Sequence, residues 1–227
     1  SGHNALVHMA RASSNHANPV VFHSNVIGTF NALEAAAVTG VSKVVVGSSV
    51  MALGKYVSLS LPPKYLPLDE DHPLAPLNTY SLAKGLIERM CAGYTLQHEM
   101  MTAAIRPTLI IGPDEYETRV KPRLDLDSAK HGLRMYVDSR DVAQLCVKCL
   151  ERLSEGEHRV YFANGPDALC REPLAEILPR EFPNVPKIEE LTASLVGTTP
   201  AATTALAKRE VGYNPLYSWR DRFPELA

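Results

Sequence analysis

The chain has 227 residues, of which 45% are hydrophobic and 21% are charged, and its formal net charge is −2. This composition predicts a globular protein of one or two domains with a full core, and the near-neutral charge argues against a surface for nucleic acid or anionic membrane. No apolar run approaches the roughly 20 residues that span a bilayer, and no secretory signal is visible. We therefore expect a cytoplasmic protein.

The four cysteines are too few for a disulfide framework. Cys146 and Cys149 fall on a helical pattern, where buried thiols are favoured over a metal site. The sequence therefore predicts reduced cysteines from a reducing compartment, and no metal site.

The first half of the chain alternates short apolar strands with amphipathic helices. Residues 5–9 predict a buried strand. Between residues 26 and 37 apolar side chains recur at helical spacing, and Gly40 is a residue suited to end this helix. Residues 43–48 contain three consecutive β-branched, apolar valines, which is typical of a parallel strand covered on both faces. The proline-rich residues 62–76 predict a loop.

The same alternation continues toward the C-terminus. A second helix is predicted over about residues 80–99, followed by a strand at 101–105. Residues 142–153 form a third amphipathic pattern, with Ser139 as its expected N-cap, and residues 159–162 predict another strand. This order indicates a doubly wound parallel sheet.

Beyond Gly165 the chain is richer in loops, with weaker helical patterns near residues 173–182 and 201–211. We predict an α/β fold in two parts. Residues 1–165 form a truncated parallel-sheet core that carries the catalytic residues. Residues 166–227 form a small mixed substrate-side subdomain against the carboxyl ends of the strands, where such sheets bind ligands.

Tyr80 and Lys84 stand four residues apart near a helix start, so their side chains share one helix face. A nearby ammonium favours the phenolate and lowers the phenol pKa from about 10 toward working pH. Ser49, at the end of the preceding strand, can hold a substrate oxygen while Tyr80 moves the proton. This chemistry suits hydride transfer at a carbinol or ketone with a nicotinamide cofactor. Taken alone, the pair also fits a solvated lysine and a half-buried tyrosine.

Matching segments run through nearly the whole chain in the order of the extended short-chain dehydrogenase/reductase family, the NAD-dependent epimerase/dehydratase group. Residues 5–10 resemble the fourth-strand motif that touches the cofactor. Residues 25–31 resemble the next helix, and residues 44–49, followed by Gly54, resemble the strand that ends in the catalytic serine. Residues 136–143 are similar to the substrate-side motif. The resemblance implies a partial Rossmann-like sheet.

The resemblance also implies roles for individual residues. The distance to Gly54 favours Ser49 as the catalytic serine, with Ser48 as a supporting cofactor contact. The segment of Arg106 and Pro107 resembles the one that passes the nicotinamide, and residues 207–215 resemble the C-terminal signature. The implied catalytic residues are Ser49, Tyr80, Lys84 and Asn25, and the implied cofactor contacts are Ala10, Ser48, Tyr80, Lys84, Arg106 and Pro107.

Several of these residues have a plainer interpretation. Asn25 also fits a capping or helix-facing amide, and Arg106 also fits an anchor for a loop carboxylate. Asp138 and Asp141 also fit acidic residues favoured at a helix N-terminus. His8, inside an apolar strand, is expected to be a hydrogen-bonded core histidine rather than a catalyst.

The sequence departs from the family pattern in two places. None of the 13 glycines forms the G-x-x-G-x-x-G turn that holds the cofactor pyrophosphate, and the strand that is fourth in the family comes first here. We therefore expect three strands to be absent and residues 5–9 to form an exposed apolar edge that invites pairing. Either the sequence is a fragment of a longer chain, or this edge is repaired and the function has changed. Residues 52–54 read Ala-Leu-Gly where many sugar-nucleotide enzymes have Val-Tyr-Gly, which weakens an assignment to a nucleotide sugar.

Three hypotheses follow for the function. The leading one is an oxidoreductase or epimerase that uses NAD or NADP and acts on a small molecule or sugar. The second is a cofactor-independent isomerase, dehydratase or cyclase on a truncated dehydrogenase fold. The third is a non-catalytic binding or scaffold protein. The expected partners are a small-molecule substrate and a second copy of the chain, by dimerisation or strand-edge pairing, with no nucleic acid and no membrane.

Overall fold

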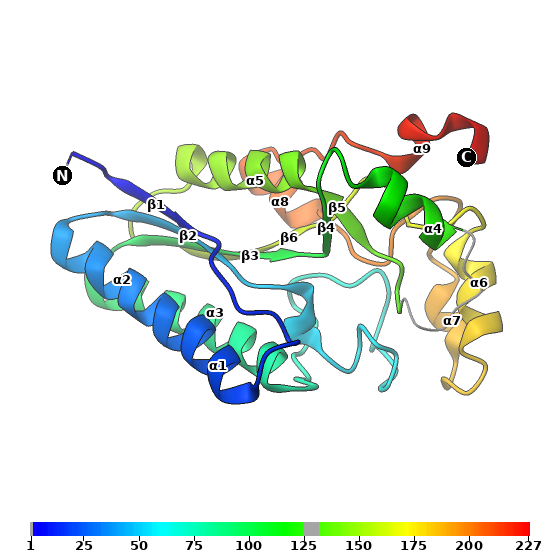
Figure 1. Cartoon of the computed structure of the whole chain (residues 1–227), viewed down its shortest axis with the longest axis horizontal. Helices are drawn as coiled ribbons and strands as arrows, with labels where there is room; N and C mark the ends of the chain where they lie inside the picture. Colours follow the sequence, from blue (N-terminus) through cyan, green and yellow to red (C-terminus); the bar gives the residue numbers. More distant parts are fainter. Residues whose placement is uncertain (1, 125–131) are drawn as a thin grey trace.

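A parallel β-sheet forms the centre of the computed structural model, which describes residues 2–124 and 132–227 (Figure 1). Its strand order is β1-β2-β3-β6, and every neighbouring pair is parallel. Helices cover both faces, so the α/β, Rossmann-like doubly wound fold expected from the sequence is confirmed. The strands of this sheet are β1 (Ala5–His8), β2 (Lys43–Gly47), β3 (Met101–Pro107) and β6 (His158–Ala163).

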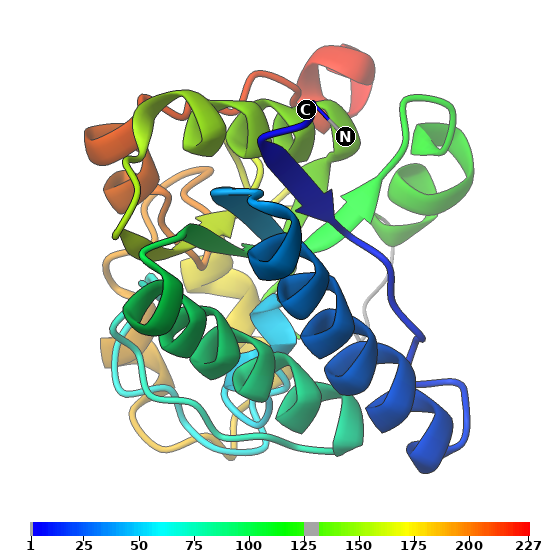
Figure 2. The same cartoon turned by 90° about the vertical axis from the view of Figure 1, so that its left-hand side faces the viewer.

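Two helical layers enclose the sheet. The helices α2 and α3 lie side by side on one face, and α5 and α8 lie on the other (Figures 1 and 2). The helices of the described residues are α1 (Asn18–Phe22), η1 (His23–Ile27, π-helical), α2 (Gly28–Thr39), η2 (Val50–Leu53, 3-10), α3 (Thr79–His98), η3 (Tyr116–Val120, π-helical), α4 (Lys121–Leu124), α5 (Ser139–Arg152), α6 (Leu174–Glu181), α7 (Ile188–Thr192), α8 (Ala205–Val211), α9 (Trp219–Arg222) and η5 (Pro224–Leu226, 3-10).

The apolar run of β2 is explained by burial on both faces of the sheet. Val44 and Val46 pack among the side chains of α2 and α3, whereas Val45 packs toward α5. All three valines are at most 1% exposed. Because side chains alternate along a strand, a run without polar residues is what a central strand of such a sheet requires.

Local signals set the ends of the main helices. Gly40 ends α2 in the left-handed conformation, with φ of 76°, as its position predicts. Asn78 and Ser81 form a capping box that starts α3. The expected N-cap of α5 was wrong by one residue. Asp138 rather than Ser139 caps this helix, because the Asp138 carboxylate accepts the backbone N–H two residues ahead.

A second, two-stranded parallel sheet was not predicted from the sequence. It pairs β4 (Leu109–Ile111) with β5 (Tyr136–Asp138). Each strand has three residues, too few for alternation to be recognised. This sheet extends the carboxyl end of β3 toward the C-terminal segments.

The proline-rich loop packs against the C-terminal helices rather than lying free. A hydrophobic cluster joins the two regions, and Leu68 also forms a parallel bridge with Ala202. The weak helical patterns expected near residues 173–182 and 201–211 correspond to α6 and α8. The side chains of the cluster include Leu66, Leu68, Leu174, Ile177, Ile188 and Leu195.

The outer strand β1 is partly exposed. Its four residues are intermediate or exposed, and Val7 is 44% exposed. Across the described ranges, the structure contains no helix long and apolar enough to cross a membrane. All four cysteines are free and buried, and the burial of Cys146 and Cys149 was expected.

Candidate active site

Tyr80 and Lys84 lie in the first turns of α3, directly after its capping box. Lys84 is only 2% exposed, and its Nζ donates a hydrogen bond of 2.5 Å to the carbonyl oxygen of Gly47 at the end of β2. The same Nζ lies 5.6 Å from the centre of the Tyr80 ring. The ammonium therefore contacts the carboxyl end of β2 and the Tyr80 ring together, as the four-residue spacing predicts.

The environment of Lys84 is unfavourable for a charge. Burial, together with the nearby Arg11 guanidinium, lowers the pKa of Lys84 to about 8, and the Glu88 carboxylate opposes both effects. A free lysine titrates at about 10.4. A lysine with a pKa near 8 can gain and lose a proton close to neutral pH, which suits a group that supports acid–base chemistry.

The two serines after β2 have different partners. Ser49 caps η2, and its Oγ accepts the backbone N–H of Met51 at 3.1 Å. The Ser49 hydroxyl hydrogen remains available to donate to another group. Ser48 instead donates from Oγ to Glu88 at 2.6 Å, and both side chains are buried. The two serines thus differ in their hydrogen bonds: the Ser48 hydroxyl donates to Glu88, whereas the Ser49 hydroxyl accepts from Met51 and keeps its own hydrogen to donate.

Glu88 is the residue of this region that sequence reasoning missed. Its carboxylate accepts a hydrogen bond from the Ser48 hydroxyl. It also forms a bidentate ion pair with Arg106, whose Nε and Nη2 both lie 2.9 Å from the carboxylate oxygens. Arg106 also donates from Nη1 to the carbonyl oxygen of Glu70. The available signal was the position of Glu88 one helical turn after Lys84, on the same face of α3. The polar atoms of Ser48 and Arg106 point to Glu88, and their contact with a cofactor stays a prediction.

Asn25 and His8 lie at the amino-terminal side of the site. Asn25 is fully buried in η1 and forms two hydrogen bonds with the backbone of Ala12, at 2.9 and 3.0 Å. This pairing holds the segment after β1 against the helix. The expected hydrogen-bonded histidine was wrong for His8, because its Nε2 is buried without a partner within residues 2–124 and 132–227. Burial lowers the pKa of His8, and the charge of Lys84 lowers it further.

The remaining predicted cofactor contacts stand at strand ends. Ala10 is exposed two residues after β1, and Pro107 is the buried last residue of β3. Parallel strands end at one edge of their sheet, so both residues belong to the edge that carries Ser49. Their contact with a cofactor also stays a prediction.

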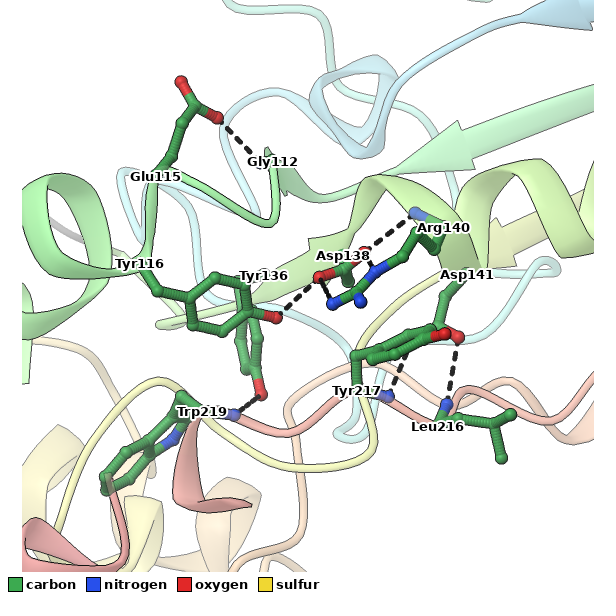
Figure 3. A network of polar contacts seen from close by, with 10 residues as sticks. All are labelled: Gly112, Glu115, Tyr116, Tyr136, Asp138, Arg140, Asp141, Leu216, Tyr217 and Trp219. Carbon is green, nitrogen blue, oxygen red and sulfur yellow. Dashed lines mark hydrogen bonds and ion pairs between the residues drawn. The ribbon is translucent and has the colours of Figure 1, made fainter. Parts of the chain in front are cut away.

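Residues 136–143, the segment predicted to lie on the substrate side, belong to a partly buried polar network (Figure 3). Asp138 caps α5, accepts the Tyr116 hydroxyl at 2.9 Å and binds the Arg140 guanidinium with both oxygens. Asp141 accepts the backbone N–H groups of Leu216 and Tyr217. These contacts fasten the C-terminal segment to the start of α5. The helix N-terminal role considered for Asp138 is therefore observed.

A cavity of about 310 Å³ opens next to η2. It combines apolar side chains with the guanidinium groups of Arg123 and Arg134, and Arg134 forms a buried ion pair with Glu181. In the part of the chain that the structure describes, no group of three or more His, Cys, Asp or Glu side chains could hold a metal ion. The residues that line the cavity are Met51, Val57, Ser58, Leu109, Arg123, Gly132, Arg134, Met135 and Leu169.

Comparison with known proteins identifies relatives over most of the chain. Residues 2–163 match the model of the NAD dependent epimerase/dehydratase family. The UDP-glucose 4-epimerase of Rhizobium meliloti (strain 1021) is 26% identical over 233 residues, which cover 88% of this chain and 68% of that protein. The UDP-glucose 4-epimerase of Rhizobium leguminosarum bv. trifolii is 32% identical over 104 residues, which cover 45% of this chain and 29% of that protein.

Solved structures support the fold. A UDP-glucose 4-epimerase from Brucella ovis in complex with NAD superposes with a TM-score of 0.66 and 23% identity, over 95% of this chain and 74% of that one. RMD from Pseudomonas aeruginosa in complex with NADPH gives a TM-score of 0.67 and 18% identity, over 98% and 80% of the two chains.

Proposed function

Because this chain belongs to the NAD dependent epimerase/dehydratase family, we propose that it is an NAD(P)-dependent oxidoreductase or epimerase with Ser49, Tyr80 and Lys84 as its proton-handling set. The family consists of NAD-dependent enzymes, and the chain is accordingly an enzyme of this class. The reacting centre is the carbinol or carbonyl carbon of a small molecule or sugar.

The proposal rests on one observation: a buried lysine with a lowered pKa lies beside Tyr80. Lys84 is held by Gly47, has a pKa of about 8 and lies 5.6 Å from the Tyr80 ring centre. A core packed only for stability would favour an apolar side chain there, because burying an ammonium is costly. In the proposed mechanism the Lys84 ammonium stabilises the negative charge that develops on Tyr80 during proton transfer.

The described residues fit the nicotinamide end of a dinucleotide. An ammonium has three donors, and the Gly47 carbonyl takes one, so Lys84 can donate to ribose hydroxyls as well. Tyr80 and Lys84 would hold that ribose, and Ala10 and Pro107 would flank the nicotinamide at the strand ends. When bound, the nicotinamide supplies or accepts the hydride.

The side chains of this chain provide the remaining steps. Ser49 donates its hydroxyl hydrogen to the substrate oxygen, since the bond that its Oγ accepts from the N–H of Met51 does not use this hydrogen. Tyr80 takes the proton from a substrate hydroxyl, or returns it to a carbonyl oxygen. Lys84 stabilises the phenolate at the moment when it is charged.

The cavity next to η2 is the proposed substrate pocket. It begins at Met51, two residues after Ser49. The Arg123 guanidinium in its lining favours an anionic substrate, whereas Arg134 is already paired with Glu181. The Rhizobium relatives are UDP-glucose 4-epimerases, so a nucleotide-linked sugar is the first substrate to test. Leu53 is fully buried and presents no hydroxyl to such a substrate, so any polar contact with the sugar must come from other residues.

We also expect the protein to form a homodimer. Leu82 and Leu86 stand one turn apart on α3 and are 45% and 37% exposed, which offers an apolar surface to a second copy. Sedimentation equilibrium measures the state directly, and a monomer at all concentrations would contradict the expectation.

The test of the proposed function is the variant Tyr80→Phe, which removes one hydroxyl and keeps the ring. With UDP-glucose and NAD⁺, turnover to UDP-galactose should fall by about 10²- to 10⁴-fold, the usual contribution of a positioned acid–base group. Cofactor binding, measured by calorimetry, should be retained. Normal turnover in Tyr80→Phe would refute the mechanism.

A further inference from the structure

Glu88 lies where three structural elements meet. Ser48 reaches it from the end of β2, Arg106 reaches it from β3, and Glu88 itself belongs to α3. The Arg106–Glu88 pair is buried, with side-chain exposures of 5% and 7%. A buried ion pair with every carboxylate oxygen occupied is a rigid arrangement, because breaking one contact leaves an uncompensated charge.

Three consecutive residues, 47–49, provide two contacts with α3 and the proposed catalytic serine. The carbonyl oxygen of Gly47 accepts a hydrogen bond from Lys84. The Ser48 hydroxyl donates a hydrogen bond to Glu88, and Ser49 is the next residue in the chain. Lys84 and Glu88 are one helical turn apart, so two polar contacts fix the end of β2 against α3 side by side. A shift of either element would change the placement of Ser49 relative to the helix face of Lys84.

We propose that Glu88 is a positioning residue. Its carboxylate is held by Arg106 and accepts the hydrogen bond from the Ser48 hydroxyl. This bond fixes the neighbouring Ser49 against α3, the helix that carries Tyr80 and Lys84. This role gives Ser48 and Arg106 a function that needs no contact with cofactor. The inference rests on the proposed function only where turnover is measured.

Glu88 also acts on the charge of Lys84. The ionisable groups around Lys84 are His8 on β1, Arg11 in the loop that follows, and Tyr80 and Glu88 on α3 itself. Arg11 disfavours the ammonium, and Glu88 favours it. Removing the charge of Glu88 would also leave the Arg106 guanidinium uncompensated on the same side.

The first experiment follows the titration of Lys84 by NMR in protein labelled with ¹³C at the lysine ε-carbon, without cofactor. In Glu88→Gln the pKa of Lys84 should fall by about one unit, as expected for the loss of an opposite charge one turn away. The matched control is Glu181→Gln, which breaks another buried ion pair, with Arg134. It should lower stability and leave the Lys84 pKa unchanged. An unchanged Lys84 pKa in Glu88→Gln would overturn the inference.

The second experiment separates positioning from cofactor contact and remains decisive if Glu88→Gln does not fold. Ser48→Ala removes the hydroxyl, and Ser48→Thr retains one. Ser48→Ala should lower kcat at least tenfold without changing the Kd for the nicotinamide cofactor, and Ser48→Thr should restore most of the rate. Weaker cofactor binding at an unchanged kcat, or full activity in Ser48→Ala, would overturn the inference. If the wild-type protein does not turn over UDP-glucose, the substrate proposal fails, and the Lys84 titration still tests Glu88.

Discussion

Replacing Lys84 by methionine should make the protein more stable at neutral pH and less stable in alkali. The fall of the Lys84 pKa from 10.5 to about 8 on folding corresponds to about 3 kcal/mol. Below pH 8 the lysine is charged in both states, and the folded state bears this cost in full. Between pH 8 and 10.5 the folded state loses the proton first, so the unfolded state binds more protons and stability rises with pH.

Methionine has no such titration, so the difference between the two proteins should change by about 3 kcal/mol across this window. Lys84→Met also loses the hydrogen bond to Gly47, which contributes about 1 kcal/mol. The variant should therefore be more stable than wild type by about 2 kcal/mol at pH 7, and less stable by about 1 kcal/mol at pH 10.5.

Urea unfolding of both proteins at several pH values from 7 to 10.5 measures this difference, and the ionisations of tyrosines remote from Lys84 cancel because both proteins share them. The exposed Lys208 provides a matched control, since Lys208→Met should give a difference that does not depend on pH. A flat difference for Lys84→Met, or a loss of stability at pH 7, would refute the account of Lys84 as a buried ammonium with a lowered pKa.

Three further substitutions test the frame around the site. Gly54→Ala should lower stability by more than about 2 kcal/mol, because φ is 50° and a Cβ would lie 2.1 Å from the Ala75 carbonyl oxygen; an unchanged Tm would contradict this. Asn25→Leu should cost about 2 kcal/mol and speed amide hydrogen exchange at Ala12, whereas unaltered exchange would argue against the paired contact. Asp138→Ala should cost about 1–2 kcal/mol through loss of the α5 N-cap, seen as a lower urea midpoint.

The sheet and its covering helices could be predicted because their signals are local and repeated. The valines of β2 indicated a strand buried on both faces, and Gly40 indicated the end of α2. The pair of Tyr80 and Lys84 was recognisable because four residues make one helical turn. Each of these inferences needs only residues that are near neighbours in the chain.

The features that were missed depend on contacts between distant segments. The carboxylate of Glu88 acquires its role from Ser48, forty residues earlier, and Arg106, eighteen residues later. The N-cap of α5 was placed at Ser139 because serine is a common cap, and only the backbone conformation shows that Asp138 occupies that position. His8 Nε2 has no hydrogen-bond partner among the described residues, and this likewise depends on packing between segments, which the sequence pattern does not indicate.

The central claim is that a nicotinamide cofactor binds beside Lys84. The most direct measurement is the ¹³C signal of the Lys84 ε-carbon during separate titrations with NAD⁺ and NADP⁺. We predict a saturable shift of that signal with at least one cofactor, together with a change in the Lys84 pKa, and no shift of the Lys208 signal. A Lys84 signal that does not move with either cofactor at any concentration would contradict the account.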